Sequence, residues 1–105
     1  MIARMWRGRA TPEAARHYVT HVTGSVFPKL ASIAGHRGAT VLTRDSGGDV
    51  EFLVVTYWDS MDAIREFAGP TPDVAVVEPA ARAILSSFDD TVHHFGVAYA
   101  TGGPR

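Results

Sequence analysis

Apolar positions along the chain fall into short segments whose spacing alternates between that of a strand and that of a helix. The β-branched and aromatic run over residues 50–58 predicts a strand buried on both faces. Asp59 and Ser60 follow with side-chain oxygens suited to a helix N-cap, and apolar residues at helical spacing continue to a Gly-Pro stop. We therefore expect a helix over residues 60–68, directly after this strand.

The N-terminal half predicts a strand, a helix and a second strand. Residues 1–6 indicate a short strand, and Thr11-Pro12-Glu13 has the composition of a helix start. One apolar face of that helix is predicted at Ala15, Tyr18, Val19, Val22 and Val26. The segment 29–34 is expected to hold a further helical turn, residues 39–44 a strand, and residues 45–49 a hairpin turn.

The C-terminal part predicts short helical pieces and a last strand. Thr71-Pro72-Asp73 is expected to start a helical piece that Glu78-Pro79 interrupts and residues 80–85 resume. Residues 91–99 predict the final strand, and residues 101–105 a flexible tail. The chain thus reads as one domain over residues 1–100, followed by that tail.

The order strand, helix, strand, strand, helix, strand predicts an α+β, ferredoxin-like split βαβ fold with a four-stranded antiparallel sheet and both helices on one face. Strand 50–58 is apolar on both sides, with Leu53 and Val55 on one side and Phe52 and Val54 on the other. We therefore expect a homodimer packed sheet to sheet. The alternative is that the helices and the last strand cover the sheet within one chain.

Composition narrows the class of protein. The chain has 105 residues, 46% hydrophobic and 20% charged, which is typical of a globular domain. A net charge of −1 argues against a nucleic-acid partner, and the lack of cysteine excludes disulfides and thiolate metal sites. No apolar run approaches the roughly 20 residues of a membrane span, and none suits a signal peptide, so we expect no membrane association and a cytoplasmic protein.

Several segments together resemble the antibiotic biosynthesis monooxygenase family of dimeric α+β barrels, over residues 1–97. They are the stretches 1–8 (MIARMWRG), 35–38 (GHRG), 57–60 (YWDS), 64–69 (IREFAG) and 92–95 (VHHF). The resemblance implies a dimeric α+β barrel with a small-molecule pocket. It leaves the activity open, since the family includes oxygenases, haem-degrading enzymes and members without an assigned activity.

Two branches of this family can be compared residue by residue. Quinone-forming members carry a Trp where Trp58 stands, but their Asn and Tyr positions hold Val54 and Ile64 here. Haem-degrading members need an Asn in the first strand, and this chain has no Asn; Phe67 and Val76 stand near their Trp and axial His. The resemblance therefore disfavours haem degradation, and we expect no cofactor.

Four residues are candidates for a catalytic site between sheet and helices. His94 has an ordinary pKa of about 6.5 and is a candidate general base; the alternative is a buried structural imidazole. Trp6 and Trp58 are candidates to orient an aromatic substrate, or they fill the core. Arg4 shares the face of Trp6 and needs a partner, either Glu78 or a substrate carboxylate or phenolate; the alternative is an exposed or intermolecular salt bridge.

Two further groups are weaker candidates. His17 and His21 lie one helical turn apart, but without a third ligand they make a poor metal site, and we expect no metal. His36 and Arg37 lie in a glycine-bracketed segment that is expected to be a solvated loop near the pocket mouth.

Two functional hypotheses follow. The first is a cofactor-independent, monooxygenase-like enzyme for an aromatic or polyketide-type small molecule, in which His94 is the base, Arg4 stabilises the anion, and Trp6 and Trp58 orient the substrate. The second is a non-catalytic small-molecule-binding or stress-type dimeric barrel that uses the same pocket.

Overall fold

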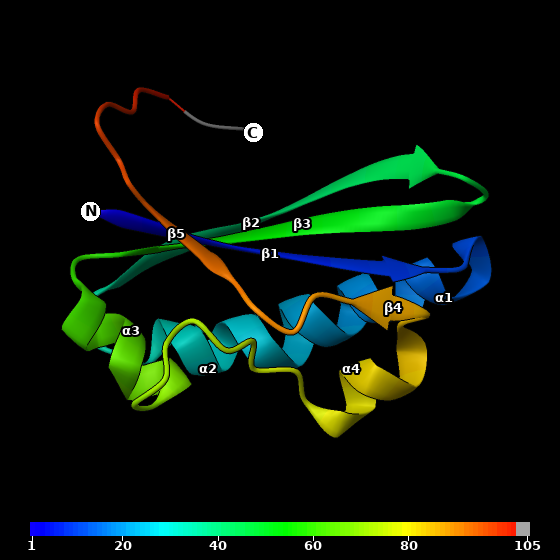
Figure 1. The fold of residues 1–105 in the computed structure, drawn as a ribbon, viewed down its shortest axis with the longest axis horizontal. Coiled ribbons are helices and arrows are strands. Elements are labelled where there is room, and N and C mark those ends of the chain that lie inside the picture. The colour runs from blue at the N-terminus through cyan, green and yellow to red at the C-terminus, as the bar shows by residue number, and fades with distance from the viewer. Residues whose placement is uncertain (103–105) are drawn as a thin grey trace.

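One antiparallel sheet carries all of the helices on one of its faces in the computed structural model, which describes residues 1–102 (Figure 1). The strands are β1 (Ile2–Ala10), β2 (His36–Ser46), β3 (Asp49–Trp58), β4 (Ser87–Phe88) and β5 (His93–Gly96). The helices are α1 (Pro12–His21), the π-helical η1 (Val22–Val26), α2 (Phe27–Ala31), α3 (Met61–Ala68) and α4 (Pro79–Ile84). This arrangement confirms the predicted α+β, ferredoxin-like fold.

Within residues 1–102 the sheet has five strands in four lateral positions. Its order is β2-β3-β1, and both β4 and β5 pair with the outer edge of β1. The predicted strand over 91–99 is shorter than expected, β4 was not predicted, and the predicted count of four strands is wrong. The reason is that the segment between β4 and β5 turns to the connection that follows α3, where the Ala75 N–H donates to the Asp90 carbonyl at 2.8 Å.

Local side-chain chemistry sets the predicted helix boundaries. The Thr11 hydroxyl accepts a hydrogen bond from the Ala14 N–H at 3.2 Å, and Ser60 caps α3 in the same way through Ala63. Gly69 ends α3 with φ of 81°, a left-handed conformation that favours glycine. These boundaries confirm the predicted starts of both main helices.

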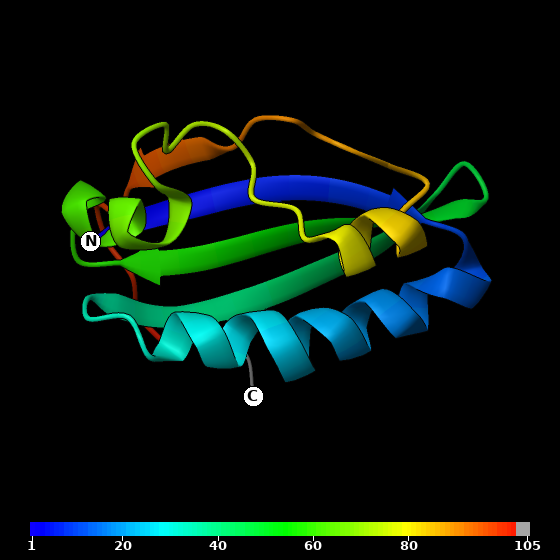
Figure 2. The same cartoon turned by 90° about the horizontal axis from the view of Figure 1, so that it is seen from below.

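The predicted helical piece at Thr71 is wrong. Residues 71–78 form a turn and an extended segment that crosses the helical face of the sheet toward α4 (Figure 2). The Arg4 guanidinium donates hydrogen bonds to the carbonyls of Pro72 and Val74, which a helix would need for its own backbone hydrogen bonds. A tertiary contact therefore overrides the local helix start, and helix resumes only at α4.

A π-helical turn joins α1 and α2 into one continuous helical rod along the sheet (Figure 2). Residues four apart in this rod, Tyr18, Val22, Val26 and Leu30, all line one cavity. Residues four apart in a regular α-helix drift around the axis by about 40° at each step, whereas the wider π turn reduces that drift. The π turn thus keeps these four side chains on one face.

The two faces of the sheet differ in whether helices pack against them. On the helical face, Phe52 and Trp58 are fully buried. On the opposite face, Leu42 is 48% and Phe95 56% exposed, and no helix of residues 1–102 covers that face (Figure 1). An apolar face of this kind is consistent with sheet-to-sheet pairing, and the homodimer stays a prediction. The predicted tail 101–105 lies mostly outside the described residues.

Candidate functional site

A mainly apolar cavity lies between the helical face of the sheet and the helical layer. Its volume is about 80 Å³. Its aromatic and aliphatic walls comprise Trp6, Tyr18, Val22, Val26, Phe27, Leu30, Val54, Phe67, Val76, Val77, Ala81 and Val92. Four polar residues also reach it: Arg4 and Thr56 from the sheet, and His21 and Glu78 from the helical layer. An apolar chamber with few polar groups is the usual form of a small-molecule site.

Arg4 is the charged group on the sheet side of this cavity. Only 5% of the residue is exposed. Its guanidinium donates to the carbonyls of Pro72 and Val74, and it lies 5.7 Å from the centre of the Phe67 ring. Burial lowers the pKa of Arg4 to about 10, against the opposing effect of Asp73, so the group stays charged at neutral pH. The cavity therefore contains a buried cation that is held mainly by neutral backbone groups.

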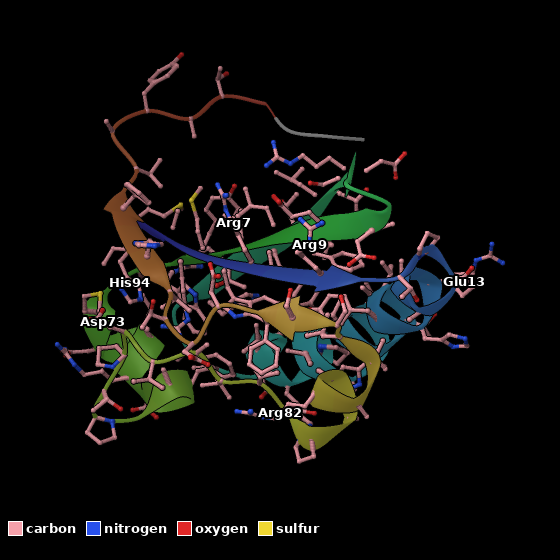
Figure 3. All side chains as sticks on the ribbon, turned by 45° about the vertical axis from the view of Figure 1, so that its right-hand side comes forward. Arg7, Arg9, Glu13, Asp73, Arg82 and His94 are labelled. Atoms are coloured by element: carbon pink, nitrogen blue, oxygen red, sulfur yellow. The ribbon has the colours of Figure 1, made fainter. Side chains whose placement is uncertain are left out.

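His94 supports Arg4 from the neighbouring strand, because β5 pairs with β1 so that Arg4 and His94 are directly opposite. The Arg4 Nη1 and the His94 Nε2 are 3.0 Å apart. A guanidinium can only donate, so Nε2 accepts and the proton of the neutral ring resides on Nδ1. That Nδ1 lies 3.3 Å from the Asp73 carboxylate, and Figure 3 shows His94 and Asp73 at the same end of the molecule. The result is a chain Asp73–His94–Arg4 that ends at the cavity.

The charge state of His94 follows from this chain. Burial lowers its pKa, and the Arg4 charge lowers it further, whereas Asp73 opposes the shift. The imidazole is therefore neutral at pH 7, with its Nε2 lone pair engaged by Arg4. His94 does not itself line the cavity and reaches it through Arg4.

The two tryptophans have different surroundings. Trp6 lines the cavity, and its indole N–H donates to the Asp89 carbonyl at 2.8 Å. Trp58 is fully buried outside the cavity lining, packs against His36 and Phe67, and donates to the Thr56 hydroxyl at 2.8 Å. The structure thus brings Trp6 to the cavity and places Trp58 in the core beneath it.

His21 and Glu78 form a second polar wall that the sequence did not single out as a pair. The His21 Nε2 lies 3.6 Å from the Glu78 carboxylate, and Lys29 contacts the other oxygen of that carboxylate at 3.2 Å. The predicted pairing of Arg4 with Glu78 is wrong, because Glu78 pairs with these two residues instead. Since His21 and Glu78 are far apart in sequence, only the packing of α4 against α1 shows that they meet.

The remaining candidates lie away from the cavity. His17 is exposed on α1, and within residues 1–102 no group of three or more His, Cys, Asp or Glu could hold a metal ion. Arg37 lies in β2 rather than in a loop and binds both carboxylate oxygens of Asp59 at 2.7 Å. This ion pair is exposed and takes no part in the cavity. In the described part of the chain, no helix has the length and apolar character to cross a membrane.

Comparison with known proteins places this geometry in context. The model of the antibiotic biosynthesis monooxygenase family matches residues 1–70, and no curated protein matches the sequence. A putative antibiotic biosynthesis monooxygenase from Bacillus cereus has a similar structure, with a TM-score of 0.64, 16% identity, and coverage of 99% of this chain and 97% of that one. A putative member from Chloroflexus aurantiacus gives a TM-score of 0.62 at 16% identity, with 96% of each chain covered.

A haem-degrading protein is also among the similar structures. MhuD from Mycobacterium tuberculosis, with two haems bound in its active site, gives a TM-score of 0.60 at 18% identity. The match covers 97% of this chain and 100% of that one. At this level of identity, these structures show a shared fold.

Proposed function

The chain belongs to the antibiotic biosynthesis monooxygenase family, and we propose that it binds and oxidises a small aromatic molecule in the cavity that contains Arg4. The observation that carries the proposal is the buried Arg4 cation, 5% exposed, at the wall of an apolar chamber. Such a cation stabilises an oxyanion strongly, because little water competes with it.

The proposed substrate is a phenol-type compound of one or two rings. The cavity of about 80 Å³ is smaller than the roughly 300–1,000 Å³ of sites for drug-sized ligands, which favours a compact aromatic. The phenolic oxygen would bind beside the Arg4 Nη1 and the His94 Nε2; because these two atoms are 3.0 Å apart, one oxygen can lie within hydrogen-bond distance of both. There it would take over the hydrogen bond from Arg4 and free the imidazole lone pair.

In the proposed reaction His94 accepts the phenolic proton, and Asp73 stabilises the imidazolium while Arg4 pairs with the phenolate. The electron-rich ring then reduces O2. For a naphthol, the carbon para to the oxygen loses its hydrogen and gains one oxygen atom of O2, and the other oxygen leaves as water. Naphthol and O2 thus give naphthoquinone and water, and the substrate supplies all of the electrons. Trp6 forms a wall for the ring, and Trp58 supports the site from the core.

Haem does not fit the cavity as the residues stand. Phe67 and Val76, which line the cavity, stand near the positions that the family resemblance assigns to a Trp and an axial His, and a valine side chain cannot ligate iron. We therefore propose no step through haem.

The second candidate is a non-catalytic binding protein. Val54 and Ile64 favour it, because they stand where quinone-forming relatives have polar groups; Val54 is an apolar wall of the cavity and Ile64 is fully buried. In either case we propose a cytoplasmic homodimer paired through the exposed sheet face that carries Leu42 and Phe95.

Oxygen uptake with 1-naphthol separates the two candidates. We expect the parent protein to consume one O2 per naphthoquinone formed, and His94→Phe to bind naphthol without turnover. Binding by the parent protein without oxygen uptake would identify a binding protein. Failure to bind any phenol or aromatic acid would refute the role of the cavity.

A further inference from the structure

The cavity has a second polar end that the proposed oxidation at Arg4 leaves unexplained. Arg4 comes from the sheet, whereas His21 comes from the end of α1 and Glu78 from the start of α4. Both of these side chains line the same chamber as Arg4. A ligand held by Arg4 on the sheet side therefore meets two hydrogen-bonding groups in the helical layer.

The hydrogen bonding of His21 is incomplete. Its Nε2 is buried and has no hydrogen-bond partner among residues 1–102. Glu78 Oε2, at 3.6 Å, lies beyond hydrogen-bond distance. A buried nitrogen without a partner has lost its hydrogen bond to water, so a ligand group that supplies the bond gains affinity from it.

Glu78 is held so that one carboxylate oxygen remains beside His21. The Lys29 ammonium binds Oε1 at 3.2 Å, whereas Oε2 is the atom nearest to His21 in their ion-pair contact. At a separation of 3.6 Å, a single oxygen atom can lie within about 2.8 Å of both groups. A hydroxyl in that position accepts from the His21 Nε2–H and donates to the Glu78 carboxylate. A methyl ether can only accept, and a bare ring edge satisfies neither group.

We propose that His21 and Glu78 form a hydroxyl-recognition subsite, so that the ligand is an aromatic with an acidic oxygen at one end and a hydroxyl at the other. This inference rests on the proposed function, because it assumes that the acidic oxygen binds at Arg4. It narrows the ligand class from phenols in general to hydroxylated aromatic acids and dihydroxy aromatics.

Fluorescence titration with two naphthoates tests the subsite. 2-Naphthoate carries only the acid group, and 6-hydroxy-2-naphthoate adds a hydroxyl at the far end. We expect the parent protein to bind the hydroxy compound roughly tenfold more tightly, as one hydrogen bond to a charged group predicts. His21→Phe and Glu78→Gln should abolish or reduce that preference, which is the ratio of the two affinities measured on the same variant.

Binding of 2-naphthoate by each variant is also the folding control, since only an intact cavity binds it. His17→Phe is the matched variant: it makes the same substitution one helical turn away, on an exposed residue, and should keep the tenfold preference. Equal affinity of the parent protein for the two naphthoates would overturn the subsite and leave the Arg4 site standing. No binding of either compound would overturn the proposed function, and the subsite with it.

Discussion

Replacing Arg4 by methionine separates a role in ligand binding from a role in stability. The substitution keeps an unbranched side chain of similar length and removes the charge. It leaves the carbonyls of Pro72 and Val74 and the His94 Nε2 without their donor. The same change removes the only basic group that lines the sheet side of the cavity within residues 1–102.

The structure gives the size of the stability effect. A pKa lowered by burial to about 10 means that the fold disfavours the charged form of Arg4 by about 3 kcal/mol. Three hydrogen bonds from a charged donor contribute about 4–5 kcal/mol at the lower end of the usual range. The methionine variant loses the contribution of the three hydrogen bonds, but it no longer bears the cost of burying a charge. The expected loss of unfolding free energy is therefore only about 1–2 kcal/mol.

Urea denaturation and naphthoate titration measure the two effects together, at one protein concentration because a dimer's stability depends on it. We expect the urea midpoint to fall slightly while the affinity for 2-naphthoate falls by at least tenfold. Arg4→Lys keeps the charge without the planar fork and should retain part of the binding. A loss of unfolding free energy above about 4 kcal/mol, together with unchanged affinity for 2-naphthoate, would show that Arg4 has only a structural role. That result would refute the reasoning.

Three further predictions follow from the structure. The pKa of His94 is lowered in the fold, so the unfolded chain takes up the proton first and stability falls as the pH drops below about 6.5. The urea midpoint of His94→Gln should therefore fall less between pH 7.5 and 5 than that of the parent protein, and an equal fall would contradict this; His36, whose pKa is also lowered by burial, contributes to the fall that remains. Leu42→Glu on the exposed sheet face should convert a dimer to a monomer in sedimentation, whereas Thr20→Glu on α1 should not; a monomeric parent protein would remove the homodimer from the proposal. Ile64→Ala removes a fully buried side chain and should lower the unfolding free energy by about 3 kcal/mol, read from the urea midpoint; a change below about 1 kcal/mol would mean that α3 packs more loosely than the structure indicates.

Much of the fold could be predicted because its boundaries are set by local chemistry. Thr11 and Ser60 cap the helices that follow them, and the apolar run of β3 specifies a central strand. The segment after Thr71 could not be predicted, since its conformation depends on hydrogen bonds from Arg4, which is distant in sequence. β4 has only two residues and carries no periodic signal.

The candidate site was predictable in part. The family resemblance and strand parity together direct Arg4, Trp6 and His94 toward the helical side of the sheet, and the pairing of β1 with β5 brings Arg4 and His94 together. Parity could not show that Trp58 lies beneath the cavity or that Asp73 reaches His94. From the sequence, His21 could be identified only as a possible metal ligand, because no local sequence pattern indicates that Glu78 packs beside it.

The π turn at residues 22–26 affects how this chain can be compared with its relatives. It accommodates more residues per turn than an α-helix, so a relative with a regular helix needs a gap near Gly24 in any alignment. Without that gap, every position from Phe27 to the end of α2 would be matched to a neighbour rotated by about 100° around the axis. Homology models and ancestral reconstructions built on such a match would point Leu30 toward solvent and open the wall of the chamber.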